Sequence, residues 1–422
     1  MVYDPDRVDI ELVVAPPYDV ITPQEQRRYY AQHPCNVVRL IAGEVLASDQ
    51  PGDNKYTRAA AFFEDWLASG VLRREQAPGA YVYGHRFRDP SSGAVKERVG
   101  LLAVTELEPF GTRVLAHERT HARPKADRLS LTQAVCANLS PVFVLYEDRR
   151  AIVGELLREA MSRPPRLQIQ PAGDETHRIW RIEDGSLLQG LAAALQPSRL
   201  FIADGHHRYQ TALNYRDAQR QAHPGAPADA AFNFVLTLLV DAADPSLLIL
   251  PTHRVVRDLP GFEPAAFLAR IHRQHSVQAW PDSTSLQSAL QSADGNHRVG
   301  IVTGGQFLSL DLPPAESRDP VERLDVSRLH QEILEAELNL VEGELDAEQH
   351  LAYSRDPRWA LGEVEEGRAQ AAFLLRPTQV RDVLAVAEAG EVMPQKSTYF
   401  YPKPLSGIVF NPLKASIRVL PA

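Results

Sequence analysis

Residues 198–222 read SRLFIADGHHRYQTALNYRDAQRQA, and this stretch predicts a strand, a tight turn and a helix. The apolar residues before Asp204 are typical of a buried strand, and Asp204 with Gly205 forms the turn. Two histidines and Arg208 then occupy the first helical turn, where free backbone N–H groups and the positive end of the helix dipole favour a bound anion.

The residue types in this turn predict a phosphate site. Gly205 lets a phosphate approach the backbone, and Arg208 can bind two of its oxygens at once. His206 and His207 add donors whose charge can change near neutral pH. The competing interpretation is that Asp204 only caps a solvated helix, but two histidines and an arginine at one turn favour the phosphate site.

The rest of the chain mixes helices and strands without a regular alternation, which favours an α+β fold. Thr22, Pro23 and Glu25 form a predicted capping box at a helix start. We expect a short strand at 36–43, a helix at 56–72 that stops at Gly70, and a hairpin around the turn DPSSGA. Later expected strands lie in SPVFVLYED, FNFVLTLLVD, LLILPTHRVV, HRVGIVTGGQFLSLDL and RAQAAFLLRP, with helices between them.

Composition limits the classes of function. The chain has 422 residues, enough for two or three domains, and 44% of them are hydrophobic and 23% charged, as in an ordinary globular protein. A net charge of −9 argues against nucleic acid as a partner. Only two cysteines, Cys35 and Cys136, occur, which fits a reducing compartment and excludes a cysteine-based zinc framework. With no expected signal peptide or membrane span, we expect a cytoplasmic protein, either monomer or homo-oligomer.

Eight motifs resemble, in order and over nearly the whole chain, a prokaryotic family known as domain of unknown function 1015. They are APPYDVI (15–21), NVVRL (36–40), HERT (117–120), PKADRL (124–129), ANLSPVF (137–143), ADGHHRY (203–209), PTHRVV (251–256) and MPQKSTYFYPK (393–403). The DGHHR turn also resembles the phosphate-binding turn of the ParB/sulfiredoxin-like superfamily, which includes free L-serine kinases. The resemblance implies an α+β protein with a ParB/sulfiredoxin-like core and additions at both ends. The expected regions are an N-terminal α/β region at 1–99, the core at 100–260 and a C-terminal α+β region at 261–422.

Residues 117–121 read HERTH, which matches the zinc-binding pattern H-E-x-x-H. A zinc site would need these residues to be helical, so that both histidines share one face. Pro124 disfavours helix just after His121, and no third ligand stands at the expected spacing. The sequence therefore favours a role for Glu118 alone over a metalloprotease site.

By resemblance to the serine kinases, Glu118 is the expected general base, since a glutamate upstream of the turn has that role there. A carboxylate that accepts the hydroxyl proton is what phosphoryl transfer to an alcohol requires. Two alternatives stay open for Glu118, namely a ligand for the magnesium of a nucleotide and a surface ion pair with Arg119 or Arg123.

The further expected site residues surround this pair of motifs. His207 and Arg208 are expected to stabilise charge in catalysis, and Asp204 to orient the ligand or contact nucleotide-bound Mg²⁺. The expected cofactor-binding residues are Asp204, Gly205, His206, His207, Arg208, Lys125, Arg128 and His117, and the expected substrate-binding residues are His253, Arg254, Tyr18 and Asp19. For Lys125, Arg128, Tyr18 and Asp19, capping or packing is an equally good interpretation. KSTYFYPK lacks the glycines of a P-loop. Its residues Lys396, Ser397, Thr398, Tyr399 and Lys403 could still close over a nucleotide, and a C-terminal strand with a tyrosine face is an equally good interpretation.

Together these observations predict a phosphotransferase that uses ATP or ADP with Mg²⁺ and acts on a small hydroxyl substrate, with L-serine the first candidate. Two alternatives remain. One is a nucleotide-binding regulatory module of the partition-protein kind, without catalysis. The other is a metal-dependent hydrolase or phosphatase that uses the histidines.

Overall fold

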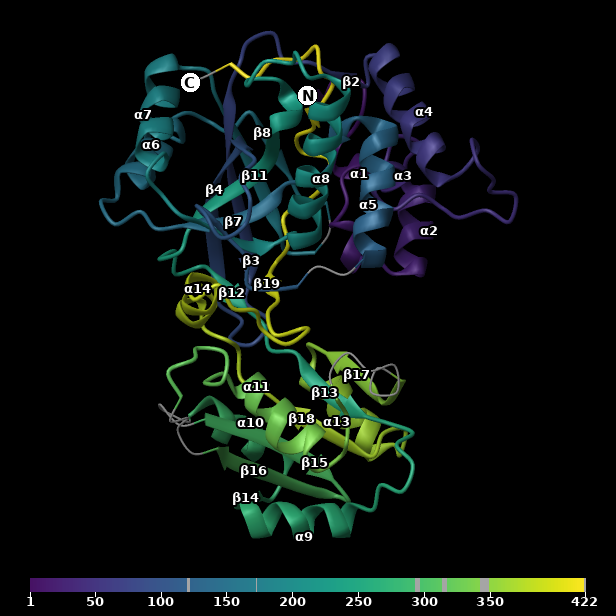
Figure 1. Cartoon of the computed structure of the whole chain (residues 1–422), viewed down its shortest axis with the longest axis vertical. Coiled ribbons are helices and arrows are strands. Elements are labelled where there is room, and N and C mark those ends of the chain that lie inside the picture. Colours follow the sequence, from purple (N-terminus) through teal and green to yellow (C-terminus); the bar gives the residue numbers. More distant parts are fainter. Residues whose placement is uncertain (120–121, 172, 293–296, 313–316, 342–348, 421–422) are drawn as a thin grey trace. The chain divides into compact units, whose positions relative to one another are not determined.

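The computed structural model describes the chain except for residues 120–121, 172, 293–296, 313–316, 342–348 and 421–422, and except for the side chains of 122–124 (Figure 1). The chain forms two compact units. The first contains Met1–Ala116, Thr120–Leu248 and Pro402–Ala422, and the second contains His117–Arg119 and Ile249–Tyr401. Helices and strands occur in both, so the α+β class is confirmed. The expected boundary between 99 and 100 falls inside a strand of the first unit, Val95–Glu106.

The first unit is built on an eight-stranded mixed sheet in the order β5-β10-β7-β11-β4-β3-β9-β8. β7 pairs antiparallel with β10 and parallel with β11, which places the strand of the DGHHR turn near one edge of the sheet. The strands of this unit are β1 (Val2–Tyr3), β2 (Leu72–Arg73), β3 (Ala80–Arg88), β4 (Val95–Glu106), β5 (Val114–Leu115), β6 (Ala137–Asn138), β7 (Val142–Tyr146), β8 (Leu167–Ile169), β9 (Thr176–Ile182), β10 (Leu200–Asp204), β11 (Phe234–Asp241) and β20 (Asn411–Pro412).

Helices surround this sheet. α8 contacts β7 and β11, and α5 packs against both α4 and α8. The helices of the unit are α1 (Ile10–Val13), η1 (Tyr18–Val20), α2 (Pro23–Gln32), α3 (Val38–Ile41), α4 (Lys55–Ala68), α5 (Ala122–Val135), α6 (Ile152–Ala160), α7 (Gly185–Leu195), α8 (His206–Ala222) and η2 (Ala231–Asn233).

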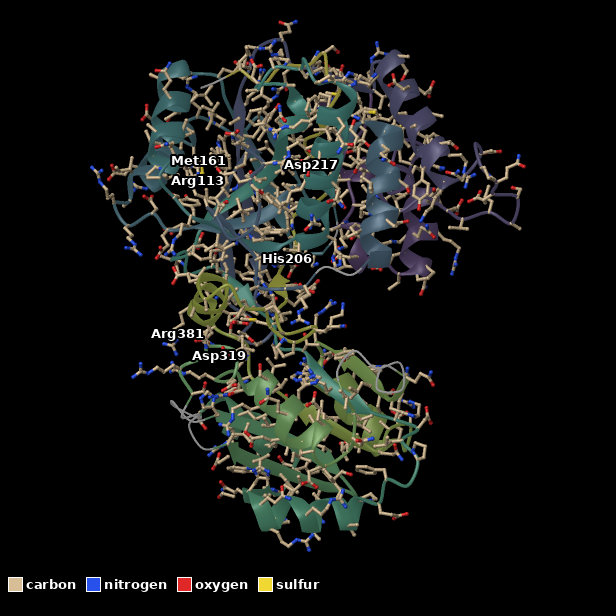
Figure 2. All side chains as sticks on the ribbon, viewed as in Figure 1. Arg113, Met161, His206, Asp217, Asp319 and Arg381 are labelled. Carbon is tan, nitrogen blue, oxygen red and sulfur yellow. The ribbon has the colours of Figure 1, made fainter. Side chains whose placement is uncertain are left out.

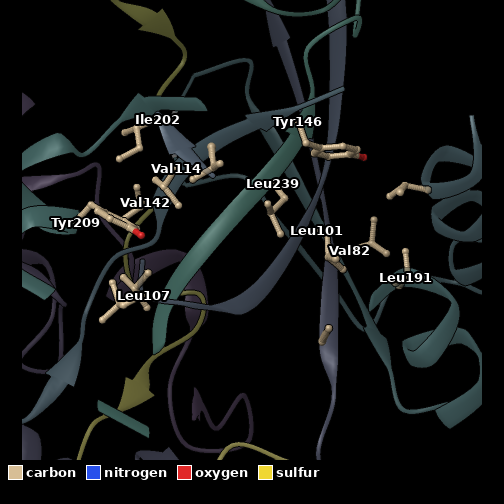
Figure 3. Packing of buried hydrophobic residues seen from close by; sticks show 14 of the residues in the cluster. Val82, Leu101, Leu107, Val114, Val142, Tyr146, Leu191, Ile202, Tyr209 and Leu239 are labelled. Atoms are coloured by element: carbon tan, nitrogen blue, oxygen red, sulfur yellow. The ribbon is translucent and has the colours of Figure 1, made fainter. Parts of the chain in front are cut away.

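A continuous apolar core holds the helices on the sheet (Figure 3). It includes Val82 and Leu101 of the central strands, Leu191 of α7 and Tyr209 of α8, all of them buried. Burial of one such side chain stabilises the fold by about 1.5–3 kcal/mol. Because Tyr209 follows the DGHHR turn directly, the core fixes the start of α8 relative to the sheet.

The second unit has a six-stranded antiparallel sheet in the order β14-β16-β15-β18-β13-β17. Its strands are β13 (His253–Val256), β14 (Ser276–Trp280), β15 (His297–Thr303), β16 (Gln306–Leu312), β17 (Leu351–Ser354), β18 (Ala371–Leu374) and β19 (Phe400–Tyr401), and β12 (Leu248–Ile249) leads into it. Its helices are α9 (Pro264–Gln274), α10 (Ser283–Gln291), α11 (Asp325–Arg328), the π-helix η3 (Leu329–Glu335), α13 (Pro357–Glu365) and α14 (Val380–Glu388).

Most local predictions are confirmed. Thr22 and Glu25 form the capping box at α2, with Pro23 in the first turn. α4 ends just before Gly70, whose φ is +76°. β3 and β4 form the predicted hairpin.

Two predicted strands are wrong. Residues 36–43 contain the helix α3 instead of a strand, because the Asn36 side chain accepts from the Val38 amide at 2.9 Å and starts a turn. The predicted strand LLILPTHRVV is two strands, β12 and β13, with Pro251 between them, since proline cannot donate to a sheet. Within the described parts of the chain, no helix is long and apolar enough to cross a membrane.

Candidate functional site

The DGHHR sequence forms the predicted strand, turn and helix in the first unit. Asp204 ends β10 and α8 begins at His206, which Figure 2 labels. Gly205 between them has φ +97°, a left-handed conformation that favours glycine. A Cβ on Gly205 would lie 2.9 Å from Nε of Arg208. Glycine is therefore required both for the turn and for the space that the Arg208 side chain occupies.

Arg208 folds back over the turn that it follows. Its Nη2 pairs with Oδ2 of Asp204 and its Nη1 donates to the carbonyl of Pro141. Lys403, from the C-terminal segment of the same unit, donates to Oδ1 of Asp204 at 2.6 Å and also pairs with Asp19. Asp204 thus holds two cations at the N-terminus of a 17-residue helix.

The charges at this turn shift the pKa of the Asp204 carboxylate. Burial alone would raise the pKa of Asp204, but the charges of Lys403 and Arg208 outweigh it and lower the pKa from 3.8 to about 2. Burial would likewise lower the pKa of Lys403, whereas Asp204 and Asp19 raise it. Both groups are therefore ionised at neutral pH, and the two cations are fixed in place by their partners.

A second group of charges joins the first through Tyr18. The guanidinium of Arg128 lies 4.0 Å from the Tyr18 ring centre, and Arg128 also pairs with Asp127. Burial raises the pKa of Tyr18, while the nearby charges of Arg128 and Arg208 lower it in part. Lys55 completes the group with an ion pair to Asp127.

The first unit therefore brings together most of the residues predicted there. Ion pairs and the ring contact of Tyr18 join Tyr18, Asp19, Arg128, Asp204 and Arg208 into one cluster, with Gly205 in the turn. His206 and His207 occupy the first turn of α8, buried and half-buried respectively. Lys125 lies half-buried near the start of α5.

The remaining predicted residues belong to the second unit. His117 is buried, its Nε2 lies 3.0 Å from Oγ1 of Thr398, and its carbonyl accepts from the Met393 amide at 2.9 Å. Arg254 donates to the Gln395 carbonyl at 3.0 Å. The motif MPQKST therefore contacts both HERT and PTHRVV within this unit. Glu118 is half-buried.

The described part of HERTH does not have the helical form that a zinc site would need. Residues 117–119 are not helical, and His121 lies outside the described residues. His253 begins β13, and its Nδ1 accepts from the Leu375 amide at 3.2 Å. Burial, with the charge of Arg254, lowers the pKa of His253 to about 4, so this side chain is neutral at pH 7.

Sequence reasoning left open whether Lys403 closes over a nucleotide, and it did not predict the pairing of Lys403 with Asp204. The only signal was its position in the motif MPQKSTYFYPK, which says nothing about a partner 199 residues away. A buried network around His85 and His177 on β3 and β9 was also missed, although E-x-H and Y-x-H spacing in strands puts such residues on one face.

These features describe an α+β protein with an ion-paired strand–turn–helix at the edge of a mixed sheet. Residues 1–327 match the family described as "Protein of unknown function (DUF1015)", and the chain belongs to that family, as its motifs predicted. No curated protein matches the chain.

Several solved structures are similar to the chain at low identity. A conserved hypothetical protein from Pyrococcus furiosus has 13% identity and a TM-score of 0.33, over 71% of this chain and 90% of that one. A free serine kinase in complex with AMP has 14% identity and a TM-score of 0.34, over 71% and 86%. SbnI with a C-terminal truncation, from Staphylococcus aureus, has 11% identity and a TM-score of 0.34, over 72% and 85%.

Proposed function

We propose that this protein is a nucleotide-dependent phosphotransferase that acts on a small hydroxyl substrate, with L-serine as the first acceptor to test. The observation that carries the proposal is the turn at Asp204 and Gly205, where Arg208 and Lys403 are fixed beside the N-terminus of α8. Cations fixed at a helix N-terminus are what a phosphate needs, and they lose little freedom when it binds.

The predicted roles fit the requirements of phosphoryl transfer. The substrate hydroxyl oxygen attacks the terminal phosphorus of the nucleotide, the bond to the bridging oxygen breaks, and the shortened nucleotide leaves. Glu118 takes the hydroxyl proton, and Arg208 and His207 stabilise charge on the phosphoryl oxygens. Mg²⁺ supplies further charge stabilisation when it is bound with the nucleotide.

The other predicted residues have supporting roles in this proposal. Asp204, which pairs with both cations of the turn, is the candidate contact of nucleotide-bound Mg²⁺. Lys125, Arg128, His206 and His117 contribute to nucleotide binding, and His253, Arg254, Tyr18 and Asp19 to substrate binding. A ParB/sulfiredoxin-like core at residues 100–260 is part of the same proposal, as is action in the cytoplasm.

The test is incubation of the full chain with ATP or ADP, Mg²⁺ and a panel of amino acids, followed by mass spectrometry of the products. The proposal expects a phosphorylated amino acid, with phosphoserine first, and loss of product in Arg208→Met. Arg158→Met is the matched control, since Arg158 is exposed on α6 of the same unit. Nucleotide binding without product from any acceptor would instead favour the regulatory module.

Elemental analysis distinguishes the kinase from the metal-dependent hydrolase. A metal-dependent hydrolase would retain about one transition-metal ion per chain and lose its activity to a chelator. That result, together with hydrolysis of a phosphate ester and no transfer to any acceptor, would overturn the kinase proposal.

A further inference from the structure

Three buried side chains form a row across adjacent strands of the first unit. His85 on β3 pairs in register with His177 on β9 and with Arg98 on β4. The exposed fractions of the three residues are 0%, 0% and 1%. Glu175 stands two residues before His177 and is partly exposed at the edge of the row.

Short contacts connect this row in both directions. Nε2 of His85 lies 2.9 Å from Oε2 of Glu175, and Nε2 of His177 lies 3.8 Å from the same oxygen. Nδ1 of His85 lies 3.3 Å from Nη2 of Arg98. Nδ1 of His177 lies 2.7 Å from the hydroxyl of Tyr83.

The chemistry of the donors fixes the proton on each imidazole. Arg98 can only donate, so Nδ1 of His85 accepts and its proton is on Nε2, facing Glu175. The Leu405 amide donates to the Tyr83 hydroxyl at 3.3 Å. Among the described residues, Nδ1 of His177 is then the acceptor for the Tyr83 proton, and His177 also carries its own proton on Nε2.

This assignment argues against a metal ion in the cluster. The ligand atoms of His85, His177 and Glu175 lie within 4.8 Å of one another, a spacing that a metal could use. A metal would need a lone pair on Nε2 of both histidines. His85 would then have to lose both ring protons, because Arg98 already donates to its Nδ1. Burial also lowers the pKa of His85 and His177 well below 6.5, so both are neutral donors rather than cations.

The network instead forms hydrogen bonds to the C-terminal segment that carries Lys403. Arg98 donates to the Pro402 carbonyl at 2.6 Å, and Tyr83 accepts from the Leu405 amide. The two anchored residues lie on either side of Lys403 in the chain. From Arg98 the hydrogen bonds lead through His85 to the carboxylate of Glu175. From Tyr83 they reach His177, whose Nε2 faces the same carboxylate at 3.8 Å without a hydrogen bond.

We infer that Glu175, His85, His177, Arg98 and Tyr83 form a positioning network that holds Lys403 at Asp204. The network acts through the backbone on either side of Lys403 and does not touch the phosphate itself. Its value for nucleotide binding rests on the proposed function, in which Lys403 contacts phosphate, but its effect on Lys403 does not. Because the hydrogen bonds from Glu175 through His85 and Arg98 to Pro402 are coupled in series, loss of the Glu175 acceptor weakens the bond to the Pro402 carbonyl.

The test measures how fast acetic anhydride acetylates Lys403 in the full chain, by mass spectrometry. Glu175→Leu removes the terminal acceptor, and Tyr83→Phe removes one hydroxyl with the ring kept. Both are expected to raise the rate at Lys403 by roughly tenfold, as loss of one buried hydrogen bond would. Glu175→Gln keeps an acceptor oxygen and should restore the slow rate.

The matched control is Glu97→Leu, which lies next to Arg98 on β4 but pairs with Arg178 and not with the network. It should leave Lys403 as slow as in the wild type. Unchanged Lys403 acetylation in both Glu175→Leu and Tyr83→Phe would overturn the inference. So would a bound metal ion that is lost in His177→Ala, because it would contradict the proton positions.

A parallel titration with ADP separates this inference from the proposed function. If the wild type binds ADP, the two network variants should bind it about tenfold more weakly, while Glu97→Leu binds as the wild type does. If the wild type does not bind ADP, the proposed function fails, and the acetylation rates still decide whether the network positions Lys403.

Discussion

Nζ of Lys403 lies 2.6 Å from Oδ1 of Asp204, and this contact ties the C-terminal segment to the strand–turn–helix. Asp204 also pairs with Arg208, and Lys403 also pairs with Asp19, so two carboxylates alternate with two cations. The four charges cancel, which offsets the loss of water around the three partly buried groups, Asp204, Arg208 and Lys403. A phosphate that enters this group meets cations that are already in place.

Lys403→Met should destabilise the first unit far more than a surface lysine change does. It leaves Asp204 with one cation in a buried position, and breaking a buried ion pair costs about 3–5 kcal/mol. Lys414→Met is the control, because Lys414 pairs with Glu64 at the surface, where a pair is worth about 0–1 kcal/mol. Urea unfolding checks both variants, and equal midpoints for the two would contradict the assignment of Lys403 to a buried pair.

Asp204 should make stability depend on pH in the acid range. Its pKa is about 2 in the folded protein and 3.8 in the unfolded chain, so the folded state favours the ionised form. The difference corresponds to about 2 kcal/mol, present above pH 3.8 and lost as the pH falls through about 2. Asp204→Asn should lack this part of the acid dependence in urea unfolding at several pH values. An identical pH dependence in wild type and variant would show that the carboxylate is not held by its cations.

Gly205→Ala should disturb the site beyond its effect on the backbone. The φ of +97° strains any residue with a Cβ by about 1–2 kcal/mol, and the new methyl group would meet the Arg208 guanidinium. Gly93→Ala is the matched control, because Gly93 also has a positive φ, +72°, but a Cβ added there would have no described atom within 4 Å beyond its chain neighbours.

Both variants should lose similar stability, but only Gly205→Ala should weaken the binding of ADP, by about tenfold or more. Isothermal titration of the two proteins measures this difference. If Gly93→Ala weakens binding as much, the effect comes from general destabilisation and not from Arg208.

The sequence predicted the turn and most of its neighbours because the information there is local. The strand before Asp204, the positive-φ glycine and the helix after it follow from residues within a few positions of each other. The pairing of Asp204 with Lys403 depends on a chain reversal over 199 residues, and no local pattern encodes it. The strand prediction for residues 36–43 was wrong for a related reason, because periodicity alone does not separate strand from helix in a short apolar run.

His330 should make the second unit sensitive to mild acid. It lies on the π-helix η3, is 3% exposed, and neither of its ring nitrogens has a hydrogen-bond partner among the described residues. Burial, with the charge of Arg254, lowers its pKa from 6.5 to about 3. Below pH 6.5 His330 is therefore protonated in the unfolded chain but stays neutral in the folded chain. The free energy of unfolding falls as the pH decreases.

The loss from His330 should reach about 2 kcal/mol at pH 5 relative to pH 8. His330→Leu should remove this part of the slope, whereas His272→Gln, at an exposed position of α9, should leave it unchanged. Urea unfolding at both pH values measures the slopes. A variant that keeps the wild-type slope would show that His330 is already protonated in the folded protein.

Glu118→Gln should separate the chemistry from the binding of nucleotide. The amide keeps the size of the side chain and cannot accept the hydroxyl proton, so turnover with the acceptor should fall by about 10²–10⁴-fold. The affinity for ADP should change less than about threefold, since the phosphate is held by Arg208 and Lys403 in the proposal. Glu391→Gln, at an exposed position of the same unit, is the control and should keep full activity. Loss of ADP binding in Glu118→Gln would instead make Glu118 a ligand for nucleotide-bound Mg²⁺ or a structural residue, and the base would then have to be sought elsewhere in the chain.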